Sequence, residues 1–107
     1  YKLCKTLESK YPGVPLMIAE SGLADADDSK RPQFILDHLA WVHRFIQEGG
    51  NIFGFTYWSL TDNWEWAEGF WPKFGLYEVD LKTFERRPRP SVKLFRSIVK
   101  DNKLPDH

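Results

Sequence analysis

Apolar positions along the chain fall into stretches with helical spacing and into short continuous runs. Residues 1–10 and 90–101 have helical spacing, and from 32 to 48 large aliphatic residues recur at i, i+4, i+7 and i+11, which predicts amphipathic helices. The continuous run over 14–19 predicts a buried strand. A second run over 52–60, rich in aromatic and β-branched residues, predicts a strand covered on both faces.

The order of these elements, strand, helix, strand and helix, predicts an α/β fold with parallel βαβ packing. Both strands would point the same way, and acidic residues follow each: Glu20 the first, Asp62 and Glu65 the second. In parallel α/β folds, the loops at the carboxyl ends of the strands build the site. Two strands cannot cover their own edges. We therefore expect residues 1–107 to be a single segment of a larger barrel, with a frayed tail over 102–107.

The stretch 52–75 joins the second strand to a loop of unusual composition. Beyond Thr61, carboxylates and an amide alternate with aromatic residues, and four of the chain's five tryptophans lie between positions 58 and 71. Sugars need this combination, because a sugar ring offers hydroxyls for hydrogen bonds and a C–H face that packs on an indole. The alternative is that the tryptophans belong to a core and that the acids are solvated loop charges.

The charge balance and the single cysteine limit which binding partners and which cellular location we expect for this protein. Fifteen basic and fifteen acidic residues give no net charge, so we expect neither nucleic acid nor a membrane as a partner. Cys4 is the only cysteine, which excludes an internal disulfide and favours a cytoplasmic protein. No Cys/His cluster has the spacing of metal ligands, so we expect no metal. The basic run of Arg86, Arg87 and Arg89 is expected to be a solvated connection.

Several segments resemble a known family. Residues 17–22, MIAESG, resemble the I-T-E-N-G motif of glycoside hydrolase family 1, the β-glucosidase family. Residues 57–80, YWSLTDNWEWAEGFWPKFGLYEVD, resemble that family's W-S-L-L-D-N-F-E-W…R-F-G-L…V-D. Residues 25–32 and 87–99 also resemble family members, the archaeal-type branch especially. The resemblance covers the chain from about residue 10 to residue 101.

The resemblance implies a partial (β/α)8 TIM barrel, in which this chain would supply strands seven and eight with their helices as a C-terminal segment. It implies a retaining β-glycosidase of the β-glucosidase type that hydrolyses terminal β-linked sugars, with no cofactor. The partner would be the N-terminal remainder of the barrel. Family members also have a cis peptide after the strand-eight tryptophan, here Trp58–Ser59, which we expect only where the surrounding barrel is complete.

By motif position, the resemblance implies five site residues. Glu20 would be the catalytic nucleophile, and Trp58 would be the platform under the sugar in the cleavage subsite. Glu65 would bind two sugar hydroxyls, Trp66 would donate its indole N–H, and Phe74 would line the same pocket. The alternatives are that Glu20 accepts a hydrogen bond from a nearby backbone N–H and that Glu65 is a solvated loop charge.

The chain departs from the family pattern in ways that bear on catalysis. Ala19 replaces the usual threonine before the nucleophile, and Ser21 replaces the usual asparagine after it. Glutamate at position 65, where the phospho-sugar branch has serine, argues against that branch because a carboxylate repels phosphate. The T-x-N-E-P motif that carries the acid/base glutamate is absent, and the family gives Asp62 a structural role. We therefore expect the isolated chain to be inactive.

Three functions are compatible with these residues. The first is part of an active β-glycosidase, completed by the remainder of the barrel. The second is a catalytically inactive fragment that self-associates into an oligomer, since four such quarters could tile a closed eight-stranded barrel. The third is a carbohydrate-binding module, which fits the aromatic residues but not the strand–helix order, because such modules are usually all-β.

Overall fold

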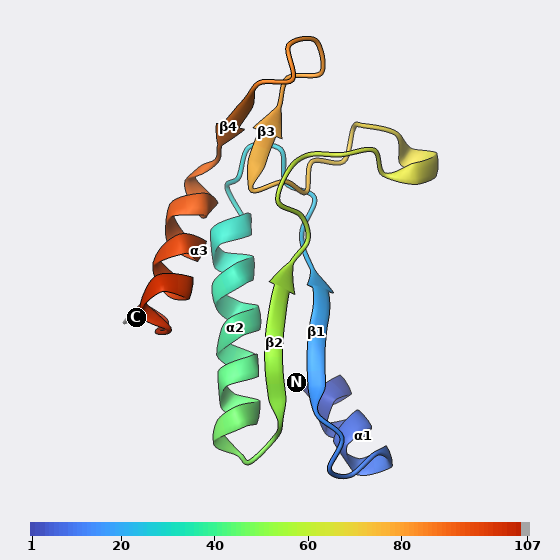
Figure 1. The fold of residues 1–107 in the computed structure, drawn as a ribbon, viewed down its shortest axis with the longest axis vertical. Helices are drawn as coiled ribbons and strands as arrows, with labels where there is room; N and C mark the ends of the chain where they lie inside the picture. Colours follow the sequence, from blue (N-terminus) through green and yellow to red (C-terminus); the bar gives the residue numbers. More distant parts are fainter. Residues whose placement is uncertain (106–107) are drawn as a thin grey trace.

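The computed structural model describes residues 1–105, which form a flat body of 48 × 35 × 19 Å (Figure 1). The elements follow in the order α1 (Lys2–Lys10), β1 (Leu16–Ser21), α2 (Arg31–Gln47), β2 (Ile52–Tyr57), the 3₁₀ helix η1 (Trp66–Glu68), β3 (Tyr77–Val79), β4 (Arg86–Pro88) and α3 (Pro90–Asp101). Within residues 1–105, no helix has the length and apolar content that crossing a membrane requires.

β1 and β2 form a parallel pair joined through α2. Their register runs from Leu16 opposite Ile52 to Ser21 opposite Tyr57. Figure 1 shows α2 running alongside β2 and α3 alongside α2, while both strands point towards the end that carries the long loop and the β3–β4 hairpin. The predicted parallel βαβ order is confirmed, and the residues that follow the two strands gather at one end of the molecule.

β2 ends at Tyr57, before the end of the predicted strand, because the backbone changes its hydrogen-bond partner there. The N–H of Trp58 still donates to the carbonyl of Ser21 (2.9 Å), but the N–H of Ser59 donates to the carbonyl of Phe74 (3.3 Å). The peptide bond between Trp58 and Ser59 is cis, although the remainder of a barrel is not part of this chain. From this point the chain enters a long loop that returns as β3.

A short antiparallel hairpin precedes the last helix, and its second strand lies where the sequence predicts a solvated connection. β3 pairs with β4. The turn between them is held by Asp80, whose carboxylate accepts the N–H groups of Lys82 (2.8 Å) and Thr83 (3.1 Å). Arg86 and Arg87 are exposed, as expected, but they pair as strand residues. Basic and proline residues have low strand propensity, so their pattern gave no signal for β4.

The hydrophobic core lies between the two long helices and β2. Its buried members are Ile35 from α2, Tyr57 from β2, Leu76 at the start of the hairpin, and Ile98 from α3. These residues come from four separate parts of the chain, so the core fixes both helices against one face of the sheet.

The other face of the β1–β2 pair is uncovered within the described residues. Met17, which is 50% exposed, and the exposed Ala19 lie on this face of β1. In β2 the exposed Thr56 lies on it, because Thr56 alternates with Gly54, which is paired with Met17, and the face of Phe55 and Tyr57 packs on the core. The prediction that the second strand is covered on both faces is therefore wrong for this chain. We call Met17, Ala19 and Thr56 the open sheet face. A parallel sheet normally has both faces covered, so the open sheet face marks where the layered structure is incomplete.

A buried ion pair joins the long loop to the start of α3. Arg89 donates from its two terminal nitrogens to the two carboxylate oxygens of Asp62, at 2.8 and 2.9 Å, and Asp62 also accepts the N–H of Gly75 (2.9 Å). Both side chains are buried, so the prediction that Arg89 is solvated is wrong. Asp62 has a structural role, as the family resemblance implied.

The ion pair sets the pKa of Asp62. Burial raises this pKa, because it disfavours the charged carboxylate. The hydrogen bonds from Arg89 and from the N–H of Gly75, together with the charge of Arg89, outweigh burial and hold the pKa of Asp62 below its ordinary value. Asp62 therefore stays charged in the folded chain at neutral pH.

We expect Asp62→Asn to lower the free energy of unfolding by about 3 kcal/mol near neutral pH, because Arg89 would stay charged and buried without its partner. Since the folded-state pKa of Asp62 is lowered, the contribution of the pair is complete above the unfolded-state pKa of about 3.9. It is lost as the pH falls through the lowered value. Urea denaturation of both proteins should show a difference that shrinks below about pH 4.

Glu78→Gln, an exposed substitution in β3, is the matched control and should change the free energy of unfolding by less than about 0.5 kcal/mol. A difference between the wild-type chain and Asp62→Asn that persisted unchanged in acid would contradict the assignment of this stability to the charged carboxylate.

Candidate active site

Glu20 lies at the carboxyl end of β1, one residue before the strand ends. Its side chain is exposed, and in the described part of the chain no hydrogen bond or ion pair occupies its carboxylate. The alternative in which Glu20 accepts a nearby backbone N–H therefore has no counterpart in this structure. An exposed carboxylate with free oxygens is available as a nucleophile, a base or a hydrogen-bond acceptor for a ligand.

Trp58 lies next to the end of β1. Its N–H donates to the carbonyl of Ser21 (2.9 Å), and its side chain is 37% exposed. Gly22 makes this close approach possible, because a Cβ at position 22 would overlap the carbonyl oxygen of Trp58. The run Glu20-Ser21-Gly22 thus suits its place: the third residue lets the two strand ends meet, and the first carries the carboxylate.

Glu65 and Trp66 lie farther out, on the loop that carries η1 (Figure 1). The N–H of Glu65 donates to the carbonyl of Gly69 (2.7 Å), which closes a tight turn in which Trp66 has a φ of 49°. Glu65 is half-buried and Trp66 is 75% exposed, with its ring 5.3 Å from that of Trp64. Among the described residues, no hydrogen bond, ion pair or ring contact joins this pair to Glu20.

Phe74 is half-buried where the long loop returns towards β3. Its carbonyl accepts the hydroxyl of Tyr57 (3.0 Å) and the N–H of Ser59 (3.3 Å). These bonds tie the returning segment to the end of β2. Of the predicted site residues, Trp58 and Phe74 are therefore linked through the backbone that follows β2, whereas Glu65 and Trp66 depend on the loop between them.

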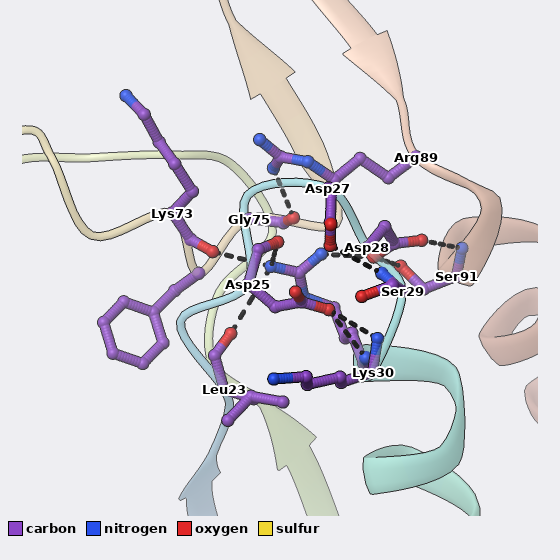
Figure 2. A network of polar contacts seen from close by, with 12 residues as sticks. Leu23, Asp25, Asp27, Asp28, Ser29, Lys30, Lys73, Gly75, Arg89 and Ser91 are labelled. Atoms are coloured by element: carbon purple, nitrogen blue, oxygen red, sulfur yellow. Dashed lines mark hydrogen bonds and ion pairs between the residues drawn. The ribbon is translucent and has the colours of Figure 1, made fainter.

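Beneath these residues lies a polar network that the sequence did not predict (Figure 2). Arg31, the first residue of α2, is fully buried and pairs with Asp28. Asp28 accepts the N–H and the hydroxyl of Ser91 at the start of α3, at 2.7 and 2.8 Å. Asp25 accepts the N–H groups of Lys30 and Arg31, at 2.8 and 2.9 Å, and so caps α2. The only signal in the sequence is the acidic run before the arginine, which is equally typical of a solvated loop.

The chemistry of the site follows from which carboxylates are free. Asp62 is held by Arg89, so it is not available as a proton donor. The carboxylate of Glu20 is exposed, and the adjacent residue Ser21 is bonded to the backbone of Trp58, whose side chain is 37% exposed. This set can hold a sugar ring and attack it, but donation of a proton to the leaving oxygen needs a further acid.

Comparisons with known proteins identify the family. The model of glycosyl hydrolase family 1 matches residues 1–104. The β-galactosidase of Pyrococcus woesei is 45% identical over 97 residues, which are 90% of this chain and 19% of that protein. The β-galactosidase of Sulfolobus acidocaldarius is 42% identical over 94 residues, which are 88% of this chain and 19% of that protein. The chain spans about a fifth of the length of these curated relatives.

Solved structures give the same result. The β-glycosidase of Thermosphaera aggregans has a TM-score of 0.95 and 45% identity, over 99% of this chain and 22% of that chain. The β-glycosidase of Pyrococcus horikoshii has a TM-score of 0.95 and 46% identity, over 99% of this chain and 25% of that chain. Members of this family are (β/α)8 barrels, of which this chain forms an α/β part. The chain belongs to glycosyl hydrolase family 1.

Proposed function

We propose that this chain is the C-terminal segment of a retaining β-glycosidase of the β-glucosidase type, and that β1 and β2 are strands seven and eight of its barrel. The observation that carries the proposal is the exposed, unpaired carboxylate of Glu20 at the end of β1, where the next residue, Ser21, accepts the N–H of Trp58. The similarity to β-glycosidases over nearly the whole chain supports it.

In this proposal Glu20 is the nucleophile. Its carboxylate oxygen forms a bond to the anomeric carbon, the glycosidic bond breaks, and the leaving oxygen takes a proton from a second glutamate. Water then displaces Glu20, and the second glutamate accepts the proton of that water. The two carboxyl groups of a retaining site lie about 5 to 5.5 Å apart. Because Asp62 is bound to Arg89, the second glutamate must come from the remainder of the barrel.

The glycone pocket would be built from the other four predicted residues. Trp58 supports the C–H face of the sugar, Glu65 accepts two hydroxyls, and Trp66 donates its indole N–H, while Phe74 lines the pocket. The substrates would be terminal β-linked sugars, in keeping with relatives described as β-galactosidase and β-glucosidase. The carboxylate of Glu65 disfavours phosphorylated sugars by charge repulsion.

The open sheet face is where the N-terminal remainder of the barrel would pack. The apolar surface of Met17 and Ala19 would then be buried, which favours association through the hydrophobic effect. The single Cys4 suits the reducing environment of the cytoplasm, where we place the protein.

A chimera tests this function. When this chain replaces the matched quarter of the Pyrococcus horikoshii β-glycosidase, we expect turnover of an aryl β-glucoside. Glu20→Gln in that chimera should lower kcat by at least roughly a thousandfold, because no covalent intermediate can form, while the melting temperature should change little. Steady-state kinetics and thermal denaturation measure the two effects.

Glu78→Gln is the matched control in the chimera, and it should leave kcat within about twofold because Glu78 is exposed on β3. A folded chimera without turnover would contradict the proposed function. Turnover retained in Glu20→Gln would remove Glu20 from the mechanism and leave the family assignment standing.

A second candidate is a catalytically inactive chain that self-associates, and the open sheet face favours it. We expect light scattering of the purified chain to give a multiple of 12.6 kDa, above all a tetramer. Met17→Lys should return the chain to a monomer, because a charge would face the apolar contact. Leu81→Lys is the matched control, since Leu81 is 47% exposed against 50% for Met17 but lies on the β3–β4 turn.

A monomeric wild-type chain would contradict self-association and leave the remainder of the barrel as the partner of the open sheet face. An oligomer that Met17→Lys did not dissociate would show that the contact lies elsewhere on the chain.

A further inference from the structure

Hydrogen bonds to its backbone atoms hold the segment Lys73–Gly75 in place on both sides of Phe74. The carbonyl of Lys73 accepts the N–H of Asp25 (2.9 Å) and a terminal nitrogen of Arg31 (2.6 Å). The carbonyl of Gly75 accepts a terminal nitrogen of Arg89 (2.7 Å), and the N–H of Gly75 donates to Asp62. Figure 2 shows the Lys73 and Gly75 carbonyls directed towards these partners. The residue between them is Phe74.

Arg31 holds one side of this segment. Its Nε donates to the hydroxyl of Tyr57 (2.8 Å), one terminal nitrogen pairs with Asp28, and the other donates to the carbonyls of Asp25 and Lys73 (2.6 Å each). The guanidinium is fully buried, so each of these bonds is made without competition from water. A planar guanidinium fixes the directions of its donors, which a flexible ammonium would not do.

Tyr57 connects Arg31 to Phe74 by hydrogen bonds. Its hydroxyl accepts from Arg31 and donates to the carbonyl of Phe74 (3.0 Å). The side chain of Tyr57 is buried, and burial raises its pKa although the charge of Arg31 opposes this. The phenol therefore keeps its proton near neutral pH and remains the donor to Phe74.

The position after Phe74 is fixed as well. A Cβ at position 75 would overlap the backbone of Asp62 and Tyr77, so Gly75 is packed against both. With the backbone immobilised on both sides, the two buried arginines and Tyr57 set the point from which the Phe74 side chain leaves the backbone.

We propose that Tyr57 and Arg31 are positioning residues for the sugar pocket, and that they set its affinity for the sugar ring by fixing the carbonyls of Lys73 and Phe74. This inference rests on the proposed function, in which Phe74 lines the pocket. The simpler interpretation is that the network only stabilises the start of α2 and of α3. The two interpretations differ in KM, because loss of stability alone does not change the affinity of the molecules that remain folded.

Tyr57→Phe in the chimera is the test, because it removes one hydroxyl and keeps the buried ring. We expect KM for the aryl β-glucoside to rise about threefold to tenfold, the effect of losing one hydrogen bond, with kcat within about twofold. Ser91→Ala is the matched control: it removes a hydroxyl bonded to Asp28 on the far side of Arg31 from Phe74, so KM should stay unchanged while the melting temperature falls.

Phe74→Ala completes a double-mutant cycle. If Tyr57 acts through Phe74, Tyr57→Phe should add little to KM once the Phe74 ring is gone. Equal effects of Tyr57→Phe on KM with and without the ring, or an unchanged KM in Tyr57→Phe, would overturn the proposal.

Hydrogen exchange in the 107-residue chain separates this inference from the proposed function. The amides of Ser59 and Asp25 bind the carbonyls of Phe74 and Lys73, so their exchange rates report on these carbonyls. Tyr57→Phe should raise the exchange rate of Ser59 severalfold relative to Ser91→Ala. If the wild-type chimera has no turnover, the proposed function fails, and equal Ser59 exchange in the two variants would then overturn the positioning role on its own.

Discussion

Two buried arginines organise the end of the molecule that carries the candidate site. Arg31 pairs with Asp28 and Arg89 with Asp62, and all four side chains are removed from water. Removing two charges from water costs several kcal/mol per ion, which a buried pair offsets only when its remaining donors and acceptors are bonded. That condition is met here because both guanidinium groups also bind backbone carbonyls of the segment Lys73–Gly75. The ion pairs thereby join the loops after both strands to the starts of α2 and α3.

The polar contacts that hold the site are therefore made within this chain, whereas the apolar contacts that would cover the sheet are not. The polar contacts that hold Trp58 and Phe74 all come from described residues. The open sheet face, in contrast, has no apolar partner among the described residues. Polar contacts are directional and local, so a short segment can complete them. Apolar burial depends on area, so a segment with two central strands cannot complete it alone.

The sequence predicted the strands and helices that have a strong apolar period, and it missed what depends on buried polar groups. Helical spacing and continuous apolar runs correctly predicted α2 and β2, because one face of each packs on the core. The strand β1 was also predicted correctly, but the expectation that it is buried is wrong for this chain, since none of its residues is buried. Motif position named Glu20 and Trp58, and in the fold the N–H of Trp58 binds the carbonyl of Ser21, the residue after Glu20. Arg31 could not be recognised, because a charged residue beside an acidic loop is normally solvated. Its burial follows from tertiary contacts with Tyr57 and Lys73, which no local pattern encodes.

The exposure of Glu20 has a consequence for how a complete site would assemble. A lone carboxylate in water keeps its hydration, so this segment folds without the desolvation cost of a buried nucleophile. That cost would arise only when the remainder of a barrel covers Glu20 and brings a second carboxyl group within about 5.5 Å, where two negative charges are disfavoured. At the buried carboxylates Asp28 and Asp62 the chain offsets the desolvation cost with an ion pair, since each carboxylate is bonded to an arginine. Glu20 has no such partner among the described residues, and this keeps its oxygens free for a substrate.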